Sequence, residues 1–245
     1  MEANALAAEP PSLLLHSGAA RARTDLGWLL SRHSFATEFP GGDAEPRLGP
    51  LRVLNDNVME PGEGLAAQLH QDVEILVWVL DGALEHQDSA GNIAVVEPGD
   101  LARLRAGNGV RHSEYNASAS ARVRLLECWI QPAQRGLVPD YERRRFPPQE
   151  RRGALRLIAS EDGSGESVQI AQPLRVYAGL FNATERAGLP AFPGRAYYAH
   201  CARGTLTVNG QALGPGDALE LHGVDGIDVS GGTDGELLLF DLPAT

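Results

Sequence analysis

Short runs of apolar and β-branched residues, closed by glycine, proline, asparagine or aspartate, recur along this chain at intervals of roughly ten residues. Residues 75–80 form an unbroken apolar run of strand length, and residues 123–130 and 175–181 are two further strand-like segments. Asn209-Gly210, between two short strand-like segments, is a strong signal for a two-residue hairpin turn. Many short strands separated by turns are typical of sandwiches and barrels, so the sequence predicts an all-β fold.

The second half of the chain repeats the plan of the first. Gly82 is followed by the turn Pro98-Gly99-Asp100 in the first copy, and Gly204 is followed by Pro215-Gly216-Asp217 in the second. Such a repeat predicts two β-barrels of similar plan in tandem. The expected organisation is a loose leader over residues 1–20, an N-terminal barrel over 21–134, a proline- and arginine-rich linker over 135–155 and a C-terminal barrel over 156–245.

Composition limits the classes of partner. The net charge of -11 argues against direct binding to the phosphate backbone of nucleic acids, and we interpret the arginines of the 135–155 linker as a solvated face. The apolar run at residues 13–15 is far too short to span a membrane, and no basic segment precedes it. Cys128 and Cys201 are expected to be buried thiols in a reducing compartment, with the cytoplasm as the default.

Residues 62–116 carry two segments that can bind a metal. Because alternate residues of a strand share a face, Gln68, His70 and Glu74 are predicted to lie on one face, and His112 and Glu114 on another. Two such faces that meet inside a barrel would gather imidazoles and carboxylates, which are ligands of divalent transition metals.

The second copy lacks these side chains. Equal counting places Phe192 opposite His70, Val229 opposite His112 and Gly231 opposite Glu114. The metal site is therefore expected in the N-terminal barrel alone.

Longer motifs identify a family. Gly62, Gln68, His70, Glu74 and Gly82, with Pro98-Gly99-Asp100, His112 and Asn116, resemble the two cupin motifs. The chain is also similar to pirin-like proteins of the bacterial quercetinase type. This likeness rests on Trp28, Arg32-His33-Ser34-Phe35, the segments 51–56, 85–92 and 106–114, Trp129-Ile130, Pro132 and the segment 238–242.

The resemblance implies a bicupin fold, with two cupin barrels and one mononuclear metal site in the first barrel. The family ligands, carried over by motif, fall at position 68, His70, His112 and Glu114. This chain has Gln68-Leu69-His70 where the family has His-Pro-His. Gln68 is therefore expected to be a weak ligand or to hold a metal-bound water, and Glu74 is an alternative ligand. Iron is the first expectation for the metal; nickel, zinc, manganese, copper or no metal are the alternatives.

The remaining histidines and tryptophans receive structural interpretations. We expect His33 to pack the N-terminal strand, His86 to face solvent, and His200 and His222 to be ordinary core or surface residues. Trp28, Trp78 and Trp129 are interpreted as core or barrel-wall residues, one of which could line a pocket for an aromatic ligand.

Two functions follow from the resemblance. The first is a quercetin 2,3-dioxygenase, in which Glu114 is the general base toward a flavonol and O2 cleaves the heterocycle. The second is a non-catalytic bicupin with a regulatory, stress-response or small-molecule-binding role. A flavonol-like aromatic molecule and protein partners are the expected partners, and a monomer is the favoured state.

Overall fold

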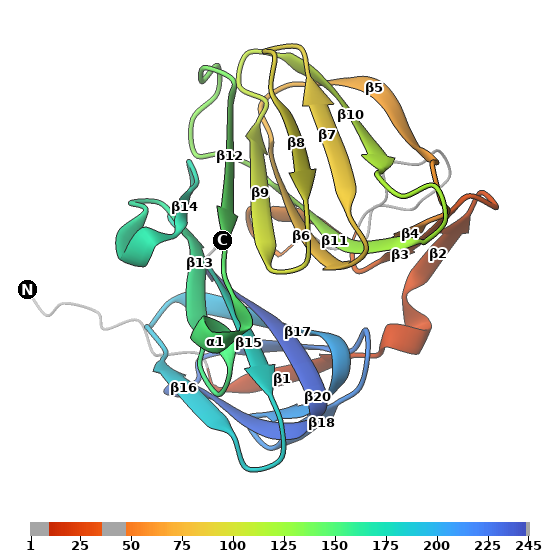
Figure 1. Ribbon diagram of the computed structural model, residues 1–245. Coiled ribbons are helices and arrows are strands. Elements are labelled where there is room, and N and C mark those ends of the chain that lie inside the picture. The colour runs from red at the N-terminus through yellow and green to blue at the C-terminus, as the bar shows by residue number, and fades with distance from the viewer. Residues whose placement is uncertain (1–9, 36–47, 244–245) are drawn as a thin grey trace, which may run out of the picture.

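The computed structural model describes residues 10–35 and 48–243. In these ranges the chain forms three β-sheets, arranged as two barrels one above the other (Figure 1). This confirms the predicted all-β fold with two cupin-type barrels. None of the helices in the described ranges is long and apolar enough to cross a membrane.

The N-terminal barrel packs a four-stranded sheet against a seven-stranded sheet. The four-stranded sheet has the order β5 (Gly64–His70), β10 (Val110–Asn116), β7 (Leu84–Asp88) and β8 (Ile93–Val96). The seven-stranded sheet has the order β12 (Asp140–Arg145), β9 (Asp100–Arg105), β6 (Glu74–Asp81), β11 (Val123–Ile130), β4 (Leu51–Met59), β3 (Leu29–His33) and β2 (Ala22–Asp25).

The C-terminal barrel is one sheet of nine strands. Its main path is β1 (Ser12–His16), β19 (Ala218–His222), β17 (Arg195–Val208), β20 (Gly226–Pro243), β15 (Arg175–Phe181), β13 (Arg156–Ser160) and β14 (Val168–Gln169). Strand β16 (Arg186–Pro190) pairs with β20, and β18 (Gln211–Leu213) pairs with β17. The helical turns are η1 (Gly18–Ala20), α1 (Pro148–Arg151) and η2 (Ser164–Glu166).

The apolar run at 75–80 lies in β6, near the middle of the seven-stranded sheet. Every residue of β6 before Asp81 is buried, as expected for a strand covered on both faces. One face packs in the interior of the N-terminal barrel and the other in the cluster shared with the C-terminal barrel. Cys128 and Cys201 are both buried free thiols, as predicted.

The N-terminal segment is more ordered than the sequence predicted. Ser12–His16 forms β1, which pairs antiparallel with β19 at the edge of the C-terminal barrel. The Gly18 amide donates a hydrogen bond to Asp217 Oδ1 at 2.7 Å, and a Cβ at Gly18 would lie 2.6 Å from the Gly216 carbonyl carbon. The expectation of a loose leader is therefore wrong for Ser12–His16, because backbone pairing holds this segment; residues 1–9 lie outside the described ranges.

The segment expected to be a linker also contributes a strand. Asp140–Arg145 forms β12, which pairs along its length with β9 and extends the N-terminal barrel past residue 134. Arg143 and Arg145 both reach the buried carboxylate of Asp100, at 3.1 and 3.5 Å. These two arginines of the segment thus have an acidic partner on the same barrel.

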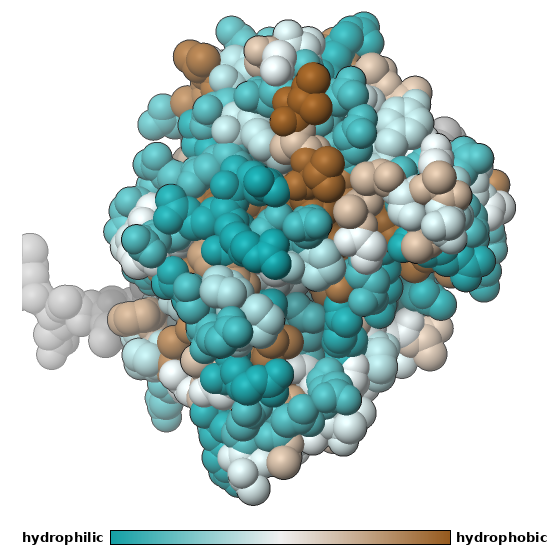
Figure 2. All heavy atoms as spheres, in the orientation of Figure 1, coloured by the Kyte–Doolittle hydropathy of each residue, from teal (hydrophilic) through white to brown (hydrophobic). Residues whose placement is uncertain are grey.

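Buried charges tie the two barrels together. Glu236, 5% exposed, accepts hydrogen bonds from Trp78 Nε1 at 3.0 Å and from Arg151 Nη1 at 3.1 Å, and it pairs with Arg203 Nε at 2.9 Å. A cavity of about 260 Å³ opens beside this group and is lined by Arg152 among others. The face of the molecule drawn in Figure 2 is largely hydrophilic, with a few separate apolar patches.

Candidate metal centre

Strand β10 presents its functional residues by simple alternation. His112, Glu114 and Asn116 are buried, whereas the alternate residues Arg111 and Tyr115 are exposed and Ser113 is half-buried. A strand with one face on the barrel interior and one in solvent shows this period of two. The sequence therefore directs His112 and Glu114 inward together, as predicted from their spacing.

Strand β7 lies beside β10 and adds a third inward side chain. Glu114 stands directly opposite His86 in the antiparallel register, and His112 stands opposite Asp88. His86 is 2% exposed, so the expectation that it faces solvent is wrong. The only hint in the sequence was the apolar Leu84 two residues earlier, because alternate residues of a strand share a face.

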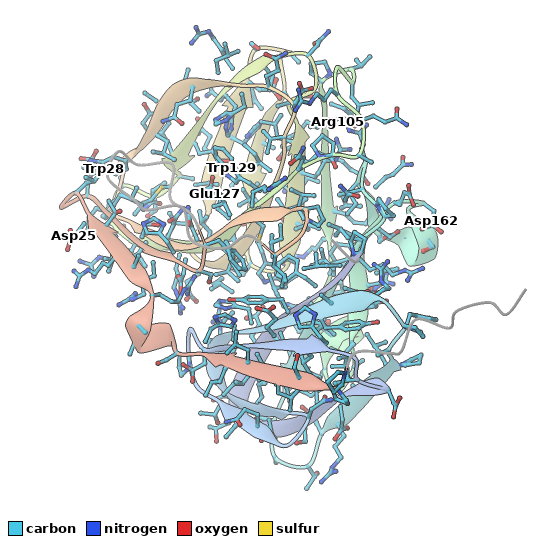
Figure 3. The ribbon with its side chains drawn as sticks, turned by 180° about the vertical axis from the view of Figure 1, so that it is seen from behind. Asp25, Trp28, Arg105, Glu127, Trp129 and Asp162 are labelled. Carbon is cyan, nitrogen blue, oxygen red and sulfur yellow. The ribbon has the colours of Figure 1, made fainter. Side chains whose placement is uncertain are left out.

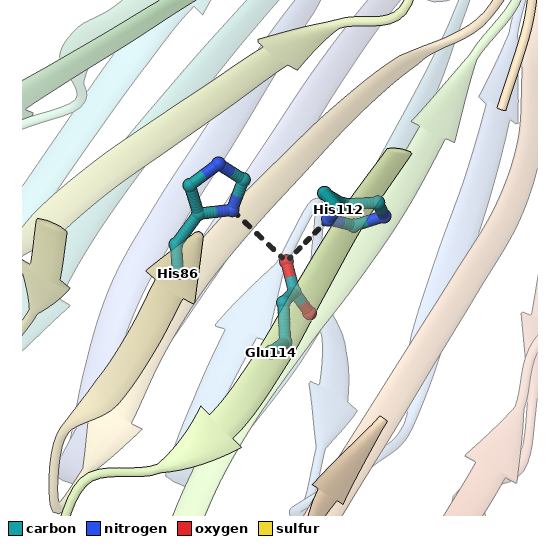
Figure 4. Close-up of side chains that lie close together, drawn as sticks. All are labelled: His86, His112 and Glu114. Carbon is teal, nitrogen blue, oxygen red and sulfur yellow. Dashed lines mark ion pairs between the residues drawn. The ribbon is translucent and has the colours of Figure 1, made fainter. Parts of the chain in front are cut away.

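His86, His112 and Glu114 converge on one point. Among the described residues they form the group whose donor atoms all lie within 4.8 Å of one another. The Oε1 atom of Glu114 lies 3.7 Å from His112 Nδ1 and 4.0 Å from His86 Nδ1. Figure 4 shows both imidazoles directing a ring nitrogen at the same carboxylate oxygen.

The donors of this cluster fit a divalent cation. His112 Nδ1 and Glu114 Oε2 are buried and have no hydrogen-bond partner among the described residues. Leaving such atoms unpaired costs about 1–3 kcal/mol each. Two imidazoles and one carboxylate form a donor set that suits iron and nickel, and a bound cation would satisfy the orphaned atoms.

His70 lies next to the cluster. Its ring is 4.8 Å from that of His112 and 4.9 Å from the Trp129 ring, between centroids, with edge-to-face geometry in both pairs. His70 is 9% exposed and terminates β5. The structure thus brings His70, His112 and Glu114 to the same end of the barrel and adds His86 to them.

Gln68 and Glu74 occupy different environments. Gln68 on β5 pairs with His112 on β10 in the antiparallel register, but the side chain of Gln68 is exposed. The site is therefore open to solvent along β5. Glu74 is fully buried, and its two oxygens accept hydrogen bonds from Arg105 Nε at 2.9 Å and from the Ala171 amide at 2.7 Å. Because both oxygens are engaged there, the structure does not place Glu74 in the cluster as the alternative ligand.

A second buried carboxylate lies behind the site. Glu127 on β11 accepts hydrogen bonds from Trp129 Nε1 at 2.6 Å and from Asn57 Nδ2 at 2.8 Å. Figure 3 labels Glu127 and Trp129 within the N-terminal barrel. Burial, together with the charge of Glu127, raises the pKa of Glu114 to about 8.

The imidazoles are held neutral. Burial, together with the nearby His70 and His86, lowers the pKa of His112 to about 3. Burial also lowers the pKa of His70 and of His86. Neutral imidazole is the form that coordinates a metal, so no proton has to leave these rings before binding.

The corresponding region of the C-terminal barrel is apolar. Val229, which the repeat aligned with His112, is fully buried in a cluster with Phe181 and Leu206. His200 is buried between the barrels, and His222 pairs with Glu220 at 2.6 Å.

Two stacked cupin barrels with a His/Glu cluster inside the first define the chain as a bicupin. The family described as Pirin matches residues 17–130, and the Quercetinase C-terminal cupin domain matches residues 157–242. A quercetin 2,3-dioxygenase of Escherichia coli K12 is 35% identical over 229 residues, which cover 91% of this chain and 95% of that protein. The chain belongs to the pirin family, as its motifs predicted.

Solved structures support the same family assignment. The bacterial pirin YhhW from Escherichia coli, in complex with nickel(II), is 34% identical with a TM-score of 0.89, and the match covers 96% of this chain and all of that chain. A quercetin 2,3-dioxygenase structure from Acinetobacter baumannii is 16% identical with a TM-score of 0.71, covers 96% of this chain and 79% of that one, and shows likeness of fold alone.

Proposed function

We propose that this pirin is a metal-dependent quercetin 2,3-dioxygenase whose reaction takes place in the N-terminal barrel. The observation that carries the proposal is the convergence of His86, His112 and Glu114 on one point with donor atoms left unpaired. The quercetin 2,3-dioxygenase relative and the nickel(II) complex of YhhW support the same chemistry.

His112 and Glu114 would hold the metal together with imidazole from the neighbouring strands β5 and β7. A divalent metal there would supply a Lewis acid that favours the ionised flavonol and brings it together with O2. Iron remains the expectation from the family resemblance, and nickel is the ion in the YhhW complex. Histidine and carboxylate donors suit both ions.

Glu114 is the proposed general base. Its Oε2 atom has no hydrogen-bond partner among the described residues, so it is free to accept the proton of a flavonol hydroxyl. Burial raises the pKa of Glu114 to about 8 in the metal-free protein, and a bound divalent cation would favour the ionised carboxylate, which is the form that accepts the proton. The proton taken from the flavonol returns to the ring-opened product.

The walls of the site favour a flat aromatic substrate. Trp129 and His70 meet edge to face beside the cluster, and the exposed Gln68 marks the open side. In the proposed reaction one flavonol and one O2 give one ring-opened ester and one carbon monoxide, and the two oxygen atoms of O2 enter the products.

The test is a turnover assay. The protein is first loaded with Fe(II) or Ni(II) under nitrogen and is then mixed with quercetin in buffer that contains O2. The amount of O2 consumed should equal the amount of carbon monoxide released. Glu114→Gln, which keeps the shape and removes the base, should lower kcat at least about 100-fold. Glu85→Gln, on the outward side of β7, is the matched control and should retain wild-type turnover.

Two outcomes would contradict this proposal. One is an unchanged kcat in metal-loaded Glu114→Gln. The other is a wild-type protein that holds a full complement of metal and binds quercetin without consuming oxygen, which would favour the non-catalytic small-molecule-binding alternative.

A further inference from the structure

We propose that the cavity between the two barrels binds a small organic carboxylate, an aromatic acid of about the size of benzoate. The cavity shares no lining residue with the His/Glu cluster of the first barrel, so this site is separate from the one that the proposed function uses. The two features that such a ligand needs meet there: guanidinium groups for its carboxylate and apolar walls for its ring.

The cavity lies where the chain passes from the first barrel to the second. Strand β6 and the Pro98-Gly99 turn line one side of it, and α1, β15 and β20 contribute to the other (Figure 1). Its volume is about 260 Å³. Pockets for drug-sized ligands measure roughly 300–1,000 Å³, so this cavity suits a smaller molecule.

Apolar side chains form much of the wall. They are Val79, Leu80, Pro98, Pro148, Leu180 and Phe181. Leu180 is half-buried, so part of its side chain remains available for contact. An aromatic ring would cover this apolar surface, whereas a bare inorganic anion would leave it in water.

The charged residues of the lining carry an excess of one positive charge. Three arginines, at positions 151, 152 and 203, accompany the two acidic residues Asp234 and Glu236, in a chain whose net charge is -11. Both oxygens of Glu236 are engaged, Oε1 by Arg151 Nη1 at 3.1 Å and Oε2 by Arg203 Nε at 2.9 Å. Asp234 is exposed. A bound carboxylate would balance the remaining guanidinium charge.

Arg151 is the fixed donor at the buried end of the group. Its Nε donates to the Phe146 carbonyl oxygen at 2.9 Å, and its guanidinium lies 4.9 Å from the centroid of the Trp78 ring. Its Nη2 makes no hydrogen bond to any residue that the structure describes, and it lies 3.5 Å from the position that a Cβ at Gly99 would take. Because Gly99 has no side chain, this nitrogen keeps space in which to meet a carboxylate oxygen.

Arg152 supplies a second guanidinium at the mouth. Its backbone bridges to Leu180, and its side chain is 52% exposed. Its one ion pair within the described ranges, to Glu185 Oε2 at 3.8 Å, is too long for a hydrogen bond. A free guanidinium can bind a carboxylate through two parallel hydrogen bonds. Arg203 is less available, because its Nη2 already donates to the Leu80 carbonyl oxygen.

The three guanidinium groups also act on one another. Burial lowers the pKa of Arg151, Glu236 opposes this shift, and the charges of Arg203 and Arg152 add to it. A carboxylate bound among them would reduce the repulsion, because charges interact more strongly where water is partly excluded.

The first test is a titration of wild-type protein with sodium benzoate, in the presence of one equivalent of zinc(II), followed by calorimetry and by NMR of the backbone amides. Benzoate should saturate one site per chain with a Kd of about 1 mM or lower. It should shift the amides of Gly99, Asn182 and Gly235, which line the cavity. Benzamide, which has a similar shape without the charge, should bind at least about tenfold more weakly, and so should inorganic phosphate, which cannot cover the apolar walls.

Two variants locate the site. Arg152→Met removes the cation at the mouth and should weaken benzoate binding at least about tenfold. Leu180→Trp fills the cavity while the three arginines stay, so benzoate should no longer saturate it. Arg186→Met, at an exposed position of β16 outside the lining, is the matched control and should stay within about twofold of wild type. A dispersed amide spectrum of each variant shows that lost binding is not a folding defect.

Four outcomes would overturn the proposal. One is a wild-type protein that benzoate does not saturate at about 20 mM. Another is benzoate binding that is unchanged in Arg152→Met or equalled by benzamide. The third is binding that is lost in His112→Ala and kept in both cavity variants, which would place benzoate in the first barrel. The fourth is tighter binding of phosphate than of benzoate, which would assign the arginines to an inorganic anion.

Discussion

Tyr141 lies flat on His86, with ring centroids 4.4 Å apart and an interplanar angle of 15°. Tyr141 belongs to β12, within the segment that the sequence predicted as a linker. Its hydroxyl is buried without a hydrogen-bond partner among the described residues, and burial raises its pKa to about 12. The aromatic ring, rather than the hydroxyl, is therefore the part that supports His86.

This contact predicts a difference between two substitutions at one position. Tyr141→Phe keeps the stack and removes the unpaired hydroxyl, so its free energy of unfolding should stay within about 1 kcal/mol of wild type. Tyr141→Ala should lower it by about 2–3 kcal/mol and weaken nickel binding about tenfold, because His86 loses its support. Urea unfolding and calorimetry measure both effects; equal nickel affinity in the two variants would exclude a positioning role for the ring.

Glu236 should be essential to the junction between the barrels. It is the shared carboxylate of Arg151 and Arg203, and its removal would leave a buried guanidinium without its counter-charge. Glu236→Gln should lower the free energy of unfolding by about 3 kcal/mol. The exposed control Glu161→Gln should change it by less than about 0.5 kcal/mol in the same denaturant titration. A loss no larger than that of the control would show that Glu236 does not hold the barrels together.

Glu114 should make the metal-free protein less stable as pH rises. Burial raises its pKa from 4.5 to about 8, so the folded state holds this proton more tightly than the unfolded state. The stabilisation is complete below pH 4.5 and is lost as pH rises through 8. Glu114→Gln should remove this part of the pH dependence, as measured by thermal unfolding in chelator from pH 5 to 9; an unchanged profile would refute the raised pKa.

His200 should make the protein less stable as pH falls, the opposite of the effect of Glu114. Burial lowers its pKa to about 3, with Arg21 and Arg124 adding to the shift and Asp56 opposing it. The folded state keeps this ring neutral, so stability present above pH 6.5 is lost as pH falls toward 3.

Replacement by an apolar side chain tests this directly. Both ring nitrogens of His200 lack partners in the described part of the chain, so His200→Leu should cost little at pH 7 and should reduce the loss of stability in acid. The exposed, non-ionisable Gln134 provides the control, Gln134→Ala, whose acid profile should match wild type. Identical acid profiles for His200→Leu and wild type would contradict the assignment.

The sequence predicted the fold class and the inward direction of His112 and Glu114 for a physical reason. Period-two alternation and turn residues are local properties, so they identified the strands and placed His112 and Glu114 on one inward face. The sequence also showed that the second copy has no counterparts of His112 and Glu114. The structure agrees, because Val229, which aligns with His112, lies in an apolar core.

Features that depend on pairing between distant segments were missed. Strand β1 is held by the edge of β19, and β12 by the edge of β9, and neither carries an alternating pattern of its own. His86 was misassigned because its neighbours Glu85 and Gln87 are polar. Its role depends on the register with β10, which local sequence does not specify.

The most direct measurement is the metal content of the protein by elemental mass spectrometry, after expression without a histidine tag and reconstitution with Fe(II) or Ni(II). Wild type and the surface control His222→Ala should carry about one metal ion per chain, and His112→Ala should carry almost none. Metal-free wild-type protein, or equal metal in His112→Ala, would contradict a metal centre in the N-terminal barrel.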